Sequence, residues 1–157
     1  MRRLSCLAAL AALLALSDAA ASNGDHLARF DGGIGSQPLA AGGAPNNVFD
    51  TNPGGRPWVI ERLVADVRDD GRVRVVGRGL LLGGGNGIGT AGAQSVRARL
   101  YCEGVPHDSD QAVALDAAGD FRIDSFLTPR PPNPCNSPVL LIINLNGAWF
   151  AAGIPKH

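Results

Sequence analysis

The stretch WVIERLVADVRDDGRVRVVGRGLLL, residues 58–82, alternates apolar and polar side chains on both sides of a central turn. A period of two is that of a β-strand with one buried face, and it predicts strands over Trp58–Arg68 and Arg72–Leu82. Between them the tripeptide Asp-Asp-Gly at 69–71 supplies a turn, in which glycine takes the positive φ that a β-branched residue avoids. The stretch therefore predicts a β-hairpin.

Further strands are predicted downstream by the same alternation or by apolar runs. They lie at Ser95–Cys102, Gln111–Leu115, Phe121–Phe126, Val139–Leu145 and Ala148–Ile154. The dipeptide Asn-Gly at 146–147 is typical of a two-residue type I′ turn, whereas the five prolines of residues 128–138 exclude that loop from a sheet interior. Seven strands at regular spacing, with no strongly helical segment after residue 21, predict an all-β fold: a single antiparallel β-sandwich of about seven strands.

Residues 116–123, DAAGDFRI, fit the pattern D-x-x-G-x-F-x-I, follow Ala112-Val113 and lie between two cysteines. This segment resembles the strand–turn–strand signature of extracellular transthyretin-like sandwiches, including the Ole e 1 type of pollen protein. The resemblance covers roughly residues 96–143 and implies the sandwich fold. It implies no catalytic or binding residue, because such folds serve many functions.

The amino terminus has the three parts of a secretory signal. Arg2 and Arg3 are followed by an apolar run, Leu4–Leu16, and then by small residues at 19–21 that offer an A-x-A cleavage site. The prediction is a signal peptide over 1–21, a Gly/Pro/Asn-rich arm over 22–57 and a sandwich domain over 58–157. An uncleaved anchor is the alternative, but the run is shorter than the about 20 residues that span a bilayer, and no later segment is long enough either.

Removal of residues 1–21 leaves twelve basic and thirteen acidic residues, because two arginines and one aspartate lie in that segment. A near-neutral chain has no bulk charge to draw it to nucleic acid or an anionic membrane. Two cysteines remain, Cys102 and Cys135, and in an oxidising compartment an even pair predicts one disulfide, with two separate buried thiols as the alternative. Lys156 is the only lysine, a usage typical of GC-rich bacterial genomes.

Two strings in the sequence resemble functional motifs but lack the context that those motifs need. Residues 87–92, GIGTAG, match G-x-G-x-x-G, but a strand follows where a dinucleotide site needs a helix, so a loop is predicted. Residues 107–110, HDSD, with Glu103 nearby, offer metal ligands, but too few in register for calcium, and a solvated loop is favoured. No G-x-S-x-G string occurs. The prediction is therefore no catalytic residue, no metal and no cofactor.

The arginines of two strands give the sharpest binding hypothesis. Arg72, Arg74 and Arg78 share a face of one strand, and Arg97 and Arg99 share a face of another. If those strands are neighbours, the guanidinium groups form a cationic strip suited to phosphate, sulfate or uronate. The favoured alternative is a solvated face neutralised by the acidic residues of the 58–82 hairpin.

These observations predict a secreted or periplasmic, non-catalytic β-sandwich protein. It would be an interaction, binding or surface accessory module whose partner is an unidentified protein or polymer. The alternative is a small extracellular hydrolase whose acid pair converges only in three dimensions.

Overall fold

A computed structural model describes residues 25–156, so the predicted signal peptide at 1–21 lies outside the described residues. The described chain is all-β, with one short 3-10 turn at Ala41–Gly43. Its strands are β1 (His26–Gly35), β2 (Trp58–Val59), β3 (Arg62–Arg68), β4 (Arg72–Arg78), β5 (Leu81–Leu82), β6 (Ser95–Cys102), β7 (Val105–Ser109), β8 (Val113–Ala114), β9 (Phe121–Thr128), β10 (Val139–Asn144) and β11 (Trp149–Pro155). Within residues 25–156 no helix is long and apolar enough to cross a membrane.

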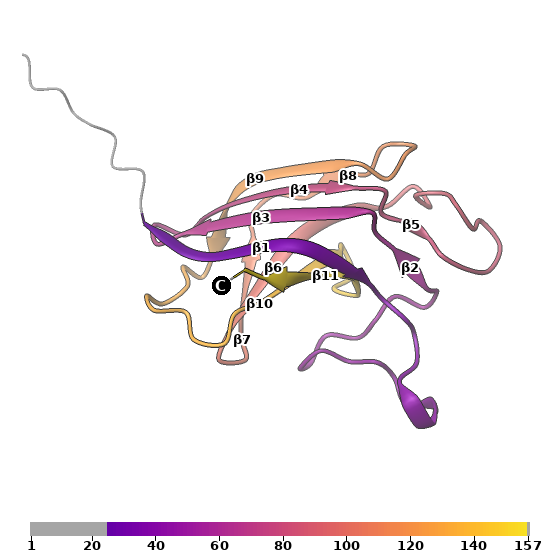
Figure 1. The fold of residues 1–157 in the computed structure, drawn as a ribbon, viewed down its shortest axis with the longest axis horizontal. Coiled ribbons are helices and arrows are strands. Elements are labelled where there is room, and N and C mark those ends of the chain that lie inside the picture. Colours follow the sequence, from indigo (N-terminus) through magenta and orange to yellow (C-terminus); the bar gives the residue numbers. More distant parts are fainter. Residues whose placement is uncertain (1–24, 157) are drawn as a thin grey trace, which may run out of the picture.

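The main sheet closes into an eight-stranded antiparallel barrel, and the predicted sandwich is wrong (Figure 1). Its strands follow in the order β10-β11-β1-β3-β4-β9-β7-β6, and β6 pairs again with β10 over the full length of that strand. The short β8 continues the line of β7 along β6. Closure satisfies the backbone hydrogen bonds that the edge strands of two open sheets would leave exposed.

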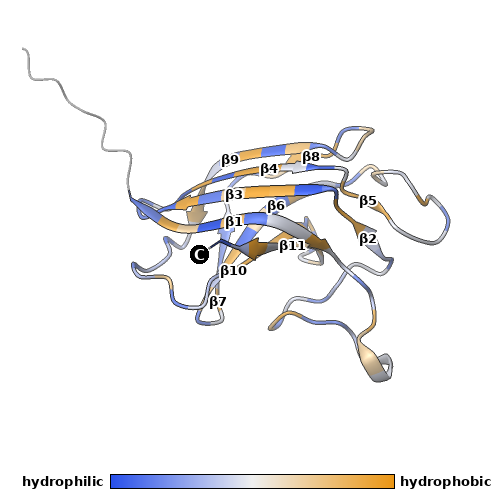
Figure 2. Ribbon diagram, viewed as in Figure 1, coloured by the Kyte–Doolittle hydropathy of each residue, from blue (hydrophilic) through white to orange (hydrophobic). Residues whose placement is uncertain are grey.

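The predicted hairpin is present as β3 and β4, with Arg62 opposite Arg78 and Val67 opposite Val73. Gly71 takes a φ of 89°, and its N–H donates to the Arg68 carbonyl. The two predicted strands do not run without interruption to residues 58 and 82, however. Their outer ends separate into β2 and β5, which pair with each other as a second, two-stranded sheet. Figure 2 shows apolar and polar residues following one another along β3, β4 and β9.

The predicted N-terminal arm contains a barrel strand. β1 pairs with β3 on one side and with β11 on the other, so the barrel begins at His26 and not at Trp58. A register shift lies between Phe30 and Gly33, beside Gly32 with its φ of 101°. Such a bulge bends the strand and interrupts its alternation.

Two apolar clusters lie on opposite faces of the barrel wall. Inward-facing side chains fill the barrel, including Phe30, Leu63, Leu100, Ile123 and Leu140, each at most 1% exposed. A second cluster lies on the outer face of β6, β10 and β11 and consists of Tyr101, Leu141, Ile143 and Trp149. Residues 46–54 cross this outer face, and Val48 packs on it. The apolar run of β10 is therefore buried on both sides, which explains its lack of alternation.

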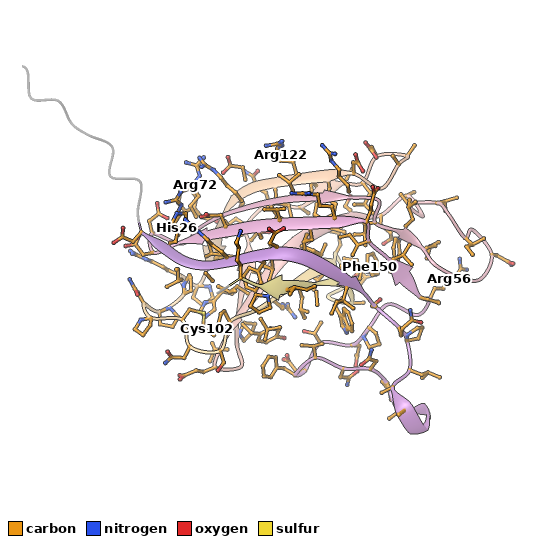
Figure 3. The ribbon with its side chains drawn as sticks, viewed as in Figure 1. His26, Arg56, Arg72, Cys102, Arg122 and Phe150 are labelled. Atoms are coloured by element: carbon orange, nitrogen blue, oxygen red, sulfur yellow. A yellow bond between two sulfur atoms is a disulfide. The ribbon has the colours of Figure 1, made fainter. Side chains whose placement is uncertain are left out.

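The two ends of the barrel are closed differently. At one end Cys102, the last residue of β6, is joined by a disulfide to Cys135 in the proline-rich loop, as predicted, with 5.0 Å between their Cα atoms. At the other end lie the β2–β5 pair, the glycine-rich loop 83–94 and the turn between β10 and β11. Figure 3 shows Cys102 near the first end and Phe150 and Arg56 near the second.

Candidate functional site

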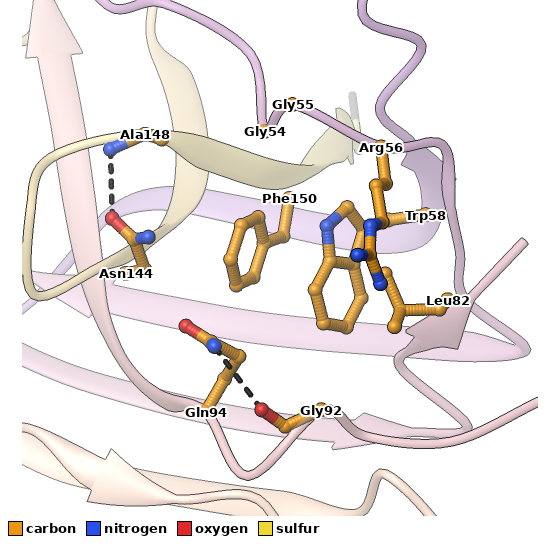
Figure 4. A pocket seen from close by; sticks show the side chains of 10 residues that line it. All are labelled: Gly54, Gly55, Arg56, Trp58, Leu82, Gly92, Gln94, Asn144, Ala148 and Phe150. Carbon is orange, nitrogen blue, oxygen red and sulfur yellow. Dashed lines mark hydrogen bonds between the residues drawn. The ribbon is translucent and has the colours of Figure 1, made fainter. Parts of the chain in front are cut away.

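A pocket of about 450 Å³ opens at the barrel end that carries the β2–β5 pair. Mouths of β-barrels are a recurrent place for ligand sites, and the volume lies within the about 300–1,000 Å³ usual for them. Its lining comes from four separate parts of the chain (Figure 4). The lining residues are Gly54, Gly55, Arg56, Trp58, Leu82, Gly92, Gln94, Asn144, Ala148 and Phe150.

Two stacked aromatic rings form the floor of the pocket. The ring centroids of Trp58 and Phe150 lie 4.0 Å apart with 17° between their planes. Both residues belong to the barrel's interior cluster, with 4% and 3% of their surface exposed, so they close the interior and line the pocket at once. Gly54 lies directly on both rings, because a Cβ there would be 2.9 Å from the indole Nε1 of Trp58 and 3.0 Å from the Phe150 ring.

Two carboxamides lie near each other at one side of these rings, and each is hydrogen-bonded through one half of its amide group (Figure 4). The Nε2 of Gln94 donates to the Gly92 carbonyl at 3.2 Å, while the Oδ1 of Asn144 accepts from the N–H groups of Asn146 and Ala148 at 3.0 and 2.9 Å. The other halves, Oε1 of Gln94 and Nδ2 of Asn144, have no partner within residues 25–156. The pocket therefore offers one fixed acceptor and one fixed donor.

Arg56 adds a cation to the rim. Its Nη1 donates to the carbonyl of Asn86 in the glycine-rich loop, which leaves the rest of the guanidinium exposed. The indole N–H of Trp58 also has no acceptor within the described chain. Carboxylate, imidazole, hydroxyl and thiol groups are absent among the described residues that line the pocket. The arrangement can bind a polar molecule with an apolar face, but it supplies no group for general acid–base or nucleophilic chemistry.

A second depression of about 450 Å³ lies on the far side of Gly92, between the glycine-rich loop and the turn after Leu115. Asp116 is its only ionisable lining residue, and the Asp116 Oδ1 already accepts from the N–H groups of Ala118 and Asp120. This depression consequently offers little beyond alanine and glycine surface to a ligand.

A partly buried polar network holds the segment 46–54 against the barrel. The hydroxyl of Tyr101 donates to Asp50 and lies 2.6 Å from the Thr51 hydroxyl, and Arg99 donates to Thr51 and, through two nitrogens, to Asp108. The hydrogen bond from Tyr101 lowers the pKa of Asp50, whereas burial and that same bond raise the pKa of Tyr101. The bonds to Asp108 raise the pKa of Arg99 despite its partial desolvation. We call this network the clasp, because it holds the segment 46–54 in place. It consists of Asp50, Thr51, Arg99, Tyr101 and Asp108.

The predicted arginine strip does not form. β4, with Arg72 and Arg74, is separated in the sheet by β9 and β7 from β6, with Arg97 and Arg99. Arg72 and Arg74 instead pair with Asp124 at 2.9 and 3.5 Å. Arg99 is committed to the clasp, and Arg97 lies two residues before it on the same outer face.

The other motif-like strings also have structural places. Residues 87–92 turn the loop back on β5, and the strand β6 follows, as predicted. The string at 107–110 is not a solvated loop, because Val105–Ser109 is β7. His107 points inward, 3% exposed, and its Nδ1 donates to the Pro129 carbonyl at 2.7 Å. Among residues 25–156 no group of three His, Cys, Asp or Glu side chains is placed to hold a metal ion.

Sequence reasoning missed the pocket residues Arg56, Gln94 and Asn144, and treated Trp58 only as a core or strand-edge residue. A weak signal existed: Asn144 precedes a glycine-containing turn, where Asn is a common cap. Nothing in their spacing links these residues, which are up to 88 residues apart in the sequence, from Arg56 to Asn144.

The chain was compared with protein-family models, curated proteins and solved structures. No family model matches the chain, and no curated protein or solved structure matches it either.

Proposed function

We propose that this protein is an exported, non-catalytic binding protein that takes a small polar ligand into the pocket at the barrel mouth. The observation that carries the proposal is the pair of carboxamides beside the Trp58–Phe150 stack. Each amide is held by one half and presents the other half, Oε1 of Gln94 or Nδ2 of Asn144, to the pocket. Fixed, unpaired polar groups over an apolar floor are the usual means by which a pocket orients a ligand.

The ligand class follows from these groups. A donor and an acceptor on two neighbouring side chains suit a ring that carries both hydroxyl or amide hydrogens and oxygen acceptors, and the aromatic rings beside them suit its apolar edge. Arg56 at the rim adds a place for a carboxylate substituent. We therefore infer a monosaccharide-sized ring or a small cyclic amide. Binding is favoured over the hydrolase alternative because the described pocket lining supplies no acid, base or nucleophile.

Export is supported by two independent features. The segment 1–21 has the pattern of a signal peptide, and the Cys102–Cys135 disulfide is the kind of cross-link that persists in oxidising compartments. A secreted or periplasmic location is consistent with both. The resemblance of residues 116–123 to transthyretin-like proteins stays a prediction about that segment.

The proposal is tested by screening a panel of neutral, N-acetylated and uronic monosaccharides and small cyclic amides by saturation-transfer NMR. Binders are then compared on Asn144→Asp. An aspartate keeps the Oδ1 that caps the hairpin but replaces the Nδ2 donor with a second acceptor, so affinity for a binder should fall about tenfold or more without loss of fold.

Asn146→Asp is the matched control, because it makes the same charge change in the same turn, and Asn146 does not line the pocket. Its affinity should stay within about twofold of the wild type, since no contact is lost. A panel without binders, or equal losses in both variants, would contradict the proposal.

A further inference from the structure

The outer wall of the barrel formed by β3, β4 and β9 carries an unpaired arginine cluster, defined as Arg62, Arg78 and Arg122. All three side chains are exposed, and the residues on either side of them in each strand face the interior or belong to turns. Figure 3 shows the side chain of Arg122 projecting outward from β9. The cluster lies toward the pocket end of the wall, whereas Arg72 and Arg74 lie toward the other end.

The register places the three cations close together. Arg62 on β3 is directly opposite Arg78 on β4. Arg122 on β9 is opposite Val76, two residues before Arg78, so Arg122 and Arg78 are diagonal neighbours. From ordinary sheet geometry, the Cα atoms of Arg62 and Arg78 lie about 5 Å apart, and those of Arg78 and Arg122 about 8 Å apart. Like charges directly opposite each other destabilise a sheet, so this arrangement works against the fold in the free protein.

The remaining arginines of the wall are neutralised by carboxylates, and the cluster is not. Arg72 and Arg74 share Asp124, and Arg68 lies 2.8 Å from Asp66, which is also 3.7 Å from Arg29 on the neighbouring strand β1. By contrast, the three cluster arginines form no ion pair within 4.0 Å anywhere in residues 25–156.

Two carboxylates do lie near the cluster but are turned to Gly79. The Asp120 Oδ1 accepts from the Gly79 N–H at 3.0 Å, and the Glu61 Oε2 would lie 3.3 Å from a Cβ on Gly79. Two depressions flank Arg122. One of about 280 Å³ is lined also by Arg74 and its partner Asp124, and one of about 300 Å³ is lined also by Arg78, Asp116 and Asp120. Arg122 therefore has open surface on both sides, and this surface carries carboxylates as well as guanidinium groups.

We propose that this cluster binds a linear acidic polysaccharide through its sulfate or uronate groups. Each exposed guanidinium–anion contact is weak, so a useful affinity needs several contacts to one polymer, which a flat wall with three cations provides. The whole chain has a formal net charge of zero, so attraction must come from this local concentration of charge. The side chains next to the arginines on this wall are Val64 and Val76. Sites for single-stranded nucleic acid use aromatic rings to stack the bases, so these valines favour a polysaccharide over a nucleic acid.

The test measures binding of the full exported chain to heparin, to polygalacturonate and to an oligothymidylate of equal charge, with neutral dextran as the blank. Heparin carries both sulfate and carboxylate groups, and polygalacturonate carries carboxylates alone, so these two arms separate the two anion chemistries. Arg62→Gln, Arg78→Gln and Arg122→Gln are combined in one variant. Its affinity for the preferred polymer should fall about 10- to 100-fold, and the salt dependence of binding should become shallower.

The matched control combines Arg29→Gln, Arg72→Gln and Arg74→Gln, which removes the same charge from paired positions, two on the same wall and one on the neighbouring strand β1. Its affinity should stay within about threefold of the wild type. The cluster variant should also melt at the same or a higher temperature, because it relieves the Arg62–Arg78 repulsion.

The proposal is overturned if the wild type binds neither polysaccharide at low salt, if both triple variants lose affinity equally, or if the oligothymidylate binds as tightly. A large drop in melting temperature in the cluster variant would also overturn it, since the arginines would then serve the fold. Asn144→Asp should leave polysaccharide binding unchanged, so this test fails or succeeds independently of the pocket.

Discussion

Reduction of the Cys102–Cys135 disulfide should destabilise the barrel by an amount that the loop length sets. The two cysteines are 33 residues apart in sequence. In the chain-entropy model, a closed loop of this length restricts the unfolded chain by about 12.5 cal/mol/K, which corresponds to about 3.7 kcal/mol at 25 °C. Both cysteines are buried, at 2% and 8% exposure, and reduction keeps their atoms in place, so little packing is lost on top of the entropic effect.

The consequence is large on the scale of ordinary domains. A loss of about 3.7 kcal/mol is a substantial part of a typical total of about 5–15 kcal/mol. For a domain of this size it should lower the Tm by about 10–15 °C.

The assay is equilibrium urea unfolding of residues 22–157, followed by tryptophan fluorescence, with and without reductant present from the unfolded state onward. The midpoint should fall on reduction, and the m-value should rise because the uncrosslinked chain exposes more surface when unfolded. Matched curves in a Cys102→Ala, Cys135→Ala variant control for effects of the reductant. A change below about 1 kcal/mol would refute the entropic reasoning.

Two further predictions concern the turn after β8 and the clasp. Gly119→Ala should destabilise the barrel by about 2–3 kcal/mol in urea unfolding, because φ is 78° and a Cβ would lie 2.5 Å from the Leu80 carbonyl oxygen; an unchanged midpoint would show that the turn moves freely. Tyr101→Phe should cost about 1 kcal/mol and flatten the acid limb of stability. The hydrogen bond from Tyr101 lowers the pKa of Asp50 in the folded protein. The stability that this bond contributes is therefore present above the unfolded pKa of about 3.9 and is lost as the pH falls through the lower folded pKa. An equal loss of stability at acid pH in the wild type and in Tyr101→Phe would argue against the clasp.

The local parts of the fold were predictable where the sequence contains its own signal. The β3–β4 hairpin follows from strict alternation on both sides of Asp-Asp-Gly, and the cysteine pair follows from its even number. The turn at 145–147 was predicted with the wrong size. Gly147 alone takes a positive φ there, and its N–H donates to the Asn144 carbonyl, which makes a three-residue loop.

The global parts depend on contacts that no local pattern encodes. Closure rests on the β6–β10 pairing, between segments about 40 residues apart, and an open sandwich would use the same alternating strands. β1 was hidden because its bulge at Gly32-Gly33 resembles a loop in sequence. The pocket was hidden for a related reason. Its carboxamides approach each other only because the barrel brings the start of β6 beside the end of β10.

The central claim is that the pocket over Trp58 takes the ligand, and the two indole N–H groups test it most directly. The Trp149 Nε1 donates to the Asn46 carbonyl at 3.0 Å beneath the segment 46–54, whereas the Trp58 Nε1 has no acceptor within the described chain. Their two cross-peaks in a ¹H–¹⁵N spectrum can be assigned with Trp58→Phe. On titration with a compound found to bind from the monosaccharide and amide panel, the Trp58 peak should shift and the Trp149 peak should stay in place. A saturating titration that leaves the Trp58 peak unmoved, or that shifts both peaks equally, would contradict the account.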